Sequence, residues 1–117
     1  MTPRLDPATV THHHLAVVRT ALRSDRALAG ILGVDPAQIS RWRTGAQSPD
    51  PENADRLAAL SVVVEILSRW LHPEAVPDWL HGPNAHLQDR SPAFMIRHGR
   101  LAQVLGAVEA ERAGAFA

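Results

Sequence analysis

The sequence of 117 residues contains no cysteine. This absence excludes a disulfide framework, a metal site built on thiolates and a cysteine nucleophile, and it suits a reducing compartment. A long apolar run is also absent, because the longest apolar stretch is far shorter than the ~18 residues that a membrane helix requires. Residues 1–6 are largely polar and no apolar run follows them before residue 12, so we expect no signal peptide. These absences predict a cytoplasmic protein with no membrane partner.

An excess of charge of either sign is absent as well, because twelve arginines balance twelve acidic residues. Zero net charge argues against broad affinity for nucleic acids. The charge is unevenly distributed, however. Residues 1–49 hold six arginines and three aspartates, a net charge of +3, whereas residues 50–117 hold six arginines and nine acidic residues, a net charge of −3. The basic half is therefore the place to look for nucleic-acid contacts, and a protein partner is the natural explanation for the acidic half.

Residues 28–45 form the stretch around which the chain is organised. Ala29 and Gly33 lie four residues apart, so they share the inner face of a short helix. The small side chain of Ala29 lets a second helix cross close by. Gly33 supplies the turn that follows, because glycine adopts a positive φ at little cost.

A second short helix follows this turn. Asp35 caps it through a side-chain oxygen, and Pro36 occupies the first helical position. Ile39 and Trp42, three residues apart, point back into the core, and Gly45 ends the helix. A small residue, a glycine four later and an isoleucine ten later are typical of a DNA-binding helix-turn-helix. The alternative is a pair of helices that only packs.

The polar positions of this second helix are candidates for contacts with DNA. A glutamine at 38 suits adenine and an arginine at 41 suits guanine, each pairing being worth about 1–3 kcal/mol of discrimination. Arg43, Thr44 and Gln47 are better suited to phosphates. The alternative is a helix edge that only faces solvent. The predicted DNA-binding residues are Gln38, Ser40, Arg41, Arg43, Thr44 and Gln47.

Apolar residues make up 45% of the sequence and recur at helical spacing along the chain. The alternation typical of strands is absent, and so are internal repeats. The expected helices cover about residues 12–23, 26–32, 36–44, 51–71, 73–80, 93–98 and 101–112, with one turn at 85–87.

The longest expected helix, 51–71, carries an apolar seam with steps of three and four residues. Such a helix either lies at the centre of the core or forms half of a dimer interface. We expect a central position, with part of the apolar face shared with a partner. The seam consists of Leu57, Leu60, Val64, Leu67 and Leu71.

Histidines do not form a recognisable metal site. His12, His13 and His14 are consecutive, and consecutive residues of a helix lie ~100° apart, so the three side chains cannot converge on one ion. The later histidines surround loops, where surface positions are the expectation. Acidic residues are scattered and no glycine-rich phosphate loop is present. The sequence therefore predicts no catalytic residue, no cofactor and no metal.

Two sets of residues carry a resemblance to a known family. Residues 39–45, followed by Pro49, resemble the Xre-type helix-turn-helix. The second half resembles the toxin-binding domain of the Xre/MbcA/ParS antitoxins, and the resemblance covers about residues 15–117. The marks in the second half are Trp79-Leu80, Pro83-Asn84, Leu87, Pro92, Gly99, Val104-Leu105, Gly114 and Phe116.

The resemblance implies a type II antitoxin. Its fold would be all-α, with an Xre-like helix-turn-helix N-terminal subdomain packed with a small helical C-terminal toxin-binding subdomain. Members of this family bind a RES-domain toxin that degrades NAD and cover the entrance to its active site, and many repress their own operon. The implied partners are a cognate RES-domain toxin and operator DNA, in a homodimer or a larger assembly with toxin. The alternative function is a stand-alone transcriptional regulator without a toxin.

The expected organisation has four parts. Residues 1–11 form a flexible arm, residues 12–49 the helix-turn-helix subdomain and residues 50–71 the long core helix. Residues 72–117 form the toxin-binding subdomain with its C-terminal tail.

Toxin binding is expected from a loop and from this tail. Asn84 should bond to its local backbone and shape the loop. The tail has one aromatic residue, Phe116, among small residues, and it would plug a pocket; the alternative is a terminus that only frays. The predicted toxin-binding residues are Asn84, Asp89, Arg90, Ala113, Gly114, Ala115, Phe116 and Ala117.

Two features depart from the family. Recognition helices of the Xre type usually begin with polar residues, whereas this chain has Pro36 and Ala37 there, which offer no hydrogen bond to a base. The glycine often found before the family's second proline is replaced here by Asp89 and Arg90. The first departure leaves base readout to residues 38 and 41.

Overall fold

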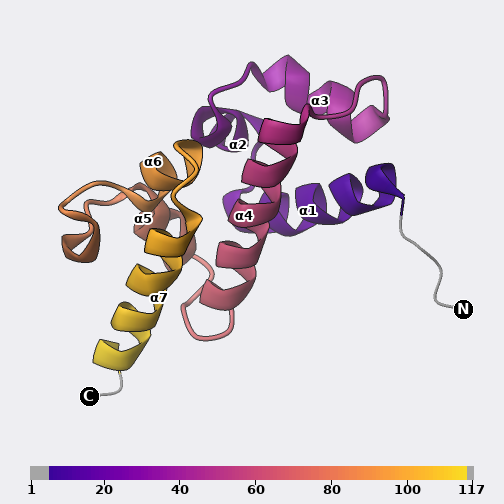
Figure 1. The fold of residues 1–117 in the computed structure, drawn as a ribbon. Helices are drawn as coiled ribbons and strands as arrows, with labels where there is room; N and C mark the ends of the chain where they lie inside the picture. The colour runs from indigo at the N-terminus through magenta and orange to yellow at the C-terminus, as the bar shows by residue number, and fades with distance from the viewer. Residues whose placement is uncertain (1–5, 116–117) are drawn as a thin grey trace, which may run out of the picture.

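The computed structural model describes residues 6–115, and these residues form helices connected by short loops (Figure 1). Within this range there is no strand, which confirms the all-α prediction. None of the helices between residues 6 and 115 combines the length and apolar character needed to cross a bilayer. The elements are α1 (Pro7–Leu22), α2 (Asp25–Leu32), α3 (Pro36–Thr44), α4 (Pro51–Leu67), α5 (Ala75–His81), the 3₁₀ turn η1 (Ala85–Leu87), α6 (Pro92–Arg97) and α7 (Leu101–Ala115).

The prediction that the first helix starts near residue 12 is wrong, because α1 begins at Pro7. Asp6 accepts a hydrogen bond from the backbone N–H of Thr9 at 2.8 Å, and Pro7 fits the first helical position. The same hydrogen bond holds the pKa of the Asp6 carboxyl below its usual value, because it favours the ionised form. Residues 7–11, expected to belong to a flexible arm, are therefore helical. Residues 1–5 of that arm lie outside the described residues.

The long helix ends earlier than predicted, at Leu67 rather than at residue 71. The backbone N–H groups of Arg69 and Trp70 reach carbonyls only three residues back, which tightens the chain into turns. Pro73 follows shortly afterwards and disfavours helical geometry at the residue before it. The last helix ends later than predicted, because α7 continues beyond residue 112 to Ala115. The small residues of the expected tail thus extend a helix.

The core is organised around α4, which lies between α1 and α7 (Figure 1). Its Leu60, Val63 and Leu67 are completely buried. Val18 of α1 and Val104 of α7 belong to the same buried cluster, so the two halves of the chain share one core. The prediction of a central position for this helix is confirmed. Its role in a dimer interface stays a prediction.

The consecutive histidines of α1 spread around the helix. His13 approaches Glu65 of α4, with Nε2 and Oε1 3.6 Å apart. Partial burial lowers the pKa of His14, and its neighbour His13 adds to the effect. Among residues 6–115, no three histidine, aspartate or glutamate side chains gather closely enough to hold a metal ion.

Two glycine-to-alanine substitutions should change stability in opposite directions. Gly33 has a φ of +74°, so Gly33→Ala should destabilise the fold by about 1–2 kcal/mol. Gly106 lies within α7, where an added methyl group meets no atom within 4 Å, so Gly106→Ala should stabilise the fold by about 0.5–1 kcal/mol. Urea unfolding of both variants checks the pair. If both variants shifted the urea midpoint of unfolding in the same direction and by the same amount, this account of the two glycines would be wrong.

Candidate DNA and partner interfaces

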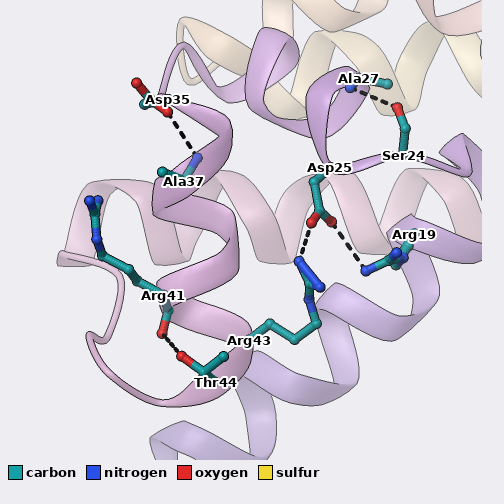
Figure 2. Close-up of polar contacts among 9 residues, drawn as sticks. All are labelled: Arg19, Ser24, Asp25, Ala27, Asp35, Ala37, Arg41, Arg43 and Thr44. Carbon is teal, nitrogen blue, oxygen red and sulfur yellow. Dashed lines mark hydrogen bonds and ion pairs between the residues drawn. The ribbon is translucent and has the colours of Figure 1, made fainter.

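The turn between α2 and α3 has the geometry that the sequence predicts. Gly33 adopts a left-handed conformation, and its N–H donates to the Ala29 carbonyl at 2.8 Å. The side chain of Asp35 accepts the Ala37 N–H at 2.8 Å (Figure 2). Ile39 and Trp42 are buried. The predicted helix-turn-helix is confirmed, and burial of one side of α3 turns its polar side towards solvent.

Gln38, Arg41 and Gln47 form a connected polar surface at α3. The Gln38 amide donates through Nε2 to Oε1 of Gln47 at 2.8 Å, and its own Oε1 accepts from the Arg41 guanidinium at 3.1 Å. The loop after α3 folds back, since the Gln47 N–H donates to the Arg41 carbonyl. The structure therefore brings three predicted DNA-binding residues together, one of them from outside the helix. Ser40 and Thr44 are also exposed on α3.

Arg43 points away from this surface. It forms an ion pair with Asp25 of α2, and the same carboxylate lies 3.4 Å from the guanidinium of Arg19 in α1 (Figure 2). Asp25 thus links α2 to both α1 and α3. A phosphate contact by Arg43, as the sequence predicts, would have to compete with this ion pair.

The loop after α5 is closed around Asn84, which is only 8% exposed. Its side-chain oxygen accepts the His86 N–H at 2.9 Å, and its carbonyl accepts the N–H groups of Leu87 and Asp89. Its own N–H donates to the Arg90 carbonyl at 3.2 Å. The prediction that Asn84 bonds to the local backbone is confirmed.

This loop contains two consecutive left-handed residues other than glycine. Gln88 has a φ of +57° and Asp89 a φ of +64°. Such a conformation is strained for most side chains, and aspartate tolerates it better than glutamine does. Of the two residues that replace the family's glycine, Asp89 therefore lies where the backbone favours glycine, whereas Arg90 does not.

A cluster around Phe94 was not predicted from the sequence. The Phe94 and His98 rings lie 4.2 Å apart between centroids, and the guanidinium carbon of Arg90 lies 5.5 Å from the Phe94 ring centroid. Phe94 is 43% exposed. Residues 90, 94 and 98 are spaced four apart, and this spacing was the only sequence signal for the cluster. The same spacing also suits a helix whose apolar residue, Phe94, packs in the core.

These residues line a hollow of about 620 Å³ between the η1 loop, α6 and the start of α7. Arg100 and Gln103 complete it from the α7 side, and among residues 6–115 no acidic side chain lines it. A smaller hollow, of about 200 Å³, is lined by Asn84 together with Glu111 near the other end of α7. The η1 loop thus lies along α7, and the predicted loop residues flank the helix that leads to the predicted tail.

The predicted tail is described only in part. Ala113 and Gly114 are exposed on the last turn of α7. Ala115 is the last described residue, and Phe116 and Ala117 lie outside the described residues. Their predicted contact with a toxin stays a prediction.

Comparisons with known proteins agree with this geometry. The helix-turn-helix family HTH_3 matches residues 21–60. The chain is 31% identical over 86 residues to the mycobacterial cidal antitoxin MbcA of Mycobacterium tuberculosis, covering 74% of this chain and 76% of MbcA. It is 35% identical over 89 residues to the probable mycobacterial cidal antitoxin Rv3188 of the same organism, covering 76% of each chain.

A solved structure extends the likeness to almost the whole fold. The match is to a chain in the crystal structure of the M. tuberculosis MbcT–MbcA toxin–antitoxin complex, with a TM-score of 0.73 and 25% identity. It covers 94% of this chain and 96% of that chain. With the sequence identity to MbcA over three quarters of its length and a helix-turn-helix at the expected place, this chain belongs to the MbcA family of antitoxins.

Proposed function

We propose that this chain neutralises a cognate RES-domain toxin by covering the entrance to the toxin's NAD-degrading active site. The observation that carries the proposal is the match, over 94% of the chain, to a component of a toxin–antitoxin complex. The second half of the chain resembles the toxin-binding domain of antitoxins that bind RES-domain toxins, and this resemblance is the reason for proposing a RES-domain partner. The function needs no catalytic residue, cofactor or metal in this chain, because occlusion is a binding event.

The end of α7 supports a role for residues 113–117 in occlusion. The helix continues to Ala115, so the segment that would enter the toxin starts from an ordered support. Ordering a segment on binding costs conformational entropy, and a helical support reduces this cost. Phe116 then supplies an aromatic anchor among small residues that permit close approach of the backbone.

A second function, binding of operator DNA, is favoured by the surface of α3. Gln38 and Arg41 are side chains suited to reading adenine and guanine, and their mutual hydrogen bond places them on one surface. Proteins with this motif commonly bind two half-sites as dimers. We therefore propose that the chain represses its own operon as a homodimer, alone or within a larger assembly with toxin.

Removal of residues 113–117 should release the toxin. The truncated chain is expected to fold normally, because Ala113 and Gly114 are exposed and contribute nothing to the core. A RES-domain toxin is first sought in the reading frame next to this chain's gene. Its NAD consumption, measured at an equimolar ratio with the truncated chain, should be at least about tenfold higher than in the complex with the full-length chain. Phe116→Ala should reproduce most of the rise.

Asp55→Asn, an exposed change on α4, serves as the control and should inhibit like the unchanged chain. Full inhibition by the truncated chain would exclude the tail from occlusion. A toxin unaffected by the full-length chain would instead support a stand-alone regulator.

Arg41→Ala should weaken binding to the promoter of its own gene by about 5- to 150-fold, which corresponds to 1–3 kcal/mol. Arg26→Ala is the matched control, because it removes the same charge from an exposed position on α2 that forms no ion pair among residues 6–115. Fluorescence anisotropy with a promoter duplex, at one fixed salt concentration, measures both. Equal losses for the two variants would mean that charge alone, and not the Gln38–Arg41 surface, determines binding. Toxin inhibition should be unchanged in both.

A further inference from the structure

The cluster formed by Arg90, Phe94, His98 and Arg100, named here the Phe94 patch, is the most distinctive exposed feature outside α3. Among the described residues only two large apolar side chains are exposed, Val62 and Phe94. Val62 stands on the outer side of α4, whereas Phe94 is covered on its flanks by a guanidinium and an imidazole. The Phe94 ring thus has charged and aromatic neighbours and remains accessible to solvent.

The patch carries positive charge in the acidic half of the sequence. Residues 50–117 have a net charge of −3, yet two arginines, Arg90 and Arg100, line the hollow beside Phe94. Neither Arg90 nor Arg100 has a carboxylate within ion-pair distance among residues 6–115. Their charge is therefore available to an outside group.

The backbone of the patch is fixed by short-range hydrogen bonds. Ser91 caps α6 by accepting the Phe94 N–H at 3.0 Å, and the Arg100 N–H donates to the Met95 carbonyl at 2.8 Å. Met95 and Ile96 are buried, which anchors α6 in the core. A surface that is ordered before binding loses little entropy when a partner docks on it.

We infer that the Phe94 patch docks onto a carboxylate-rich surface of the toxin. This inference rests on the proposed function and adds the chemistry of the contact. Aromatic residues and arginines are the side chains that most often dominate binding energy in protein interfaces. Here Phe94 is the anchor, and Arg90 and Arg100 provide the charge that an acidic partner would neutralise.

The arrangement of the fold favours a toxin over nucleic acid or a second copy of this chain. The patch lies on α6 and the start of α7, and α2 stands between α6 and the recognition helix α3 (Figure 1). DNA bound at α3 would therefore leave the patch uncovered. A two-fold contact between copies through this patch would set arginines against arginines. A toxin bound along α7 would reach both the patch and the predicted tail.

Binding kinetics with the RES-domain toxin sought in the neighbouring reading frame test the inference. Phe94→Ala should accelerate dissociation at least about tenfold, because it removes the anchor. Arg100→Glu should slow association at least about tenfold at low salt, because it reverses the attracting charge. Raising the salt concentration should reduce the difference in association rate between Arg100→Glu and the unchanged chain.

Two matched variants control for the loss of any exposed apolar side chain and for the change in net charge. Val62→Ala removes the other exposed large apolar side chain, and Arg26→Glu makes the same change in net charge on α2. Both should keep rates within about twofold of the unchanged chain. Thermal melting establishes that each variant folds. Arg100 is exposed, so Arg100→Glu decides the question even where Phe94→Ala is unstable.

The possible outcomes are distinguishable. If the unchanged chain binds no toxin, the proposed function itself fails. If the unchanged chain binds toxin, and Phe94→Ala and Arg100→Glu bind it with the same rates as the unchanged chain, only the docking inference fails. Equal slowing by Arg100→Glu and Arg26→Glu would assign the effect to net charge and overturn the patch. A loss of promoter binding by Arg100→Glu with unchanged toxin kinetics would assign the patch to nucleic acid.

Discussion

The burial of α4 from both sides is the constraint on which the rest of the structure depends. Leu60, Val63 and Leu67 have no exposed surface, because α1 covers the helix on one side and α7 on the other. A helix that is apolar on more than one face must be central. Neither half of the chain could bury this helix alone, so the helix-turn-helix and the C-terminal helices are joined into one body.

Much of this fold could be predicted because its decisive signals are local. Gly33 at the turn, Asp35 at the cap and Trp42 on the inner face each meet a steric or hydrogen-bonding need within a few residues. Helix ends were harder, because competing signals meet there. Pro7 is typical of a loop, and only the capping role of Asp6 indicates that a helix begins there. Leu71 fits the apolar spacing of the long helix, although the chain already forms tight turns after Leu67.

The candidate sites could be predicted only where one segment contains them. Asn84 acts on its own loop, and the sequence predicted that it bonds to the local backbone. The ion pair between Asp25 and Arg43 joins separate helices, and no spacing indicates it. The same holds for the Phe94 patch, whose character depends on Arg100 approaching from the start of α7. Long-range contacts of this kind arise from tertiary packing, and a single sequence carries no direct signal for them.

The position of α2 separates the two proposed binding surfaces. It packs against α3 on one side and against α6 on the other, and the Arg97 guanidinium of α6 lies directly over Gly33. The turn that orients the recognition helix is therefore in contact with the element that carries Phe94. Because α2 separates α3 from α6, a protein docked on α6 and α7 would leave the Gln38–Arg41 surface open. In the two proposals, operator DNA and toxin therefore contact different residues of this chain.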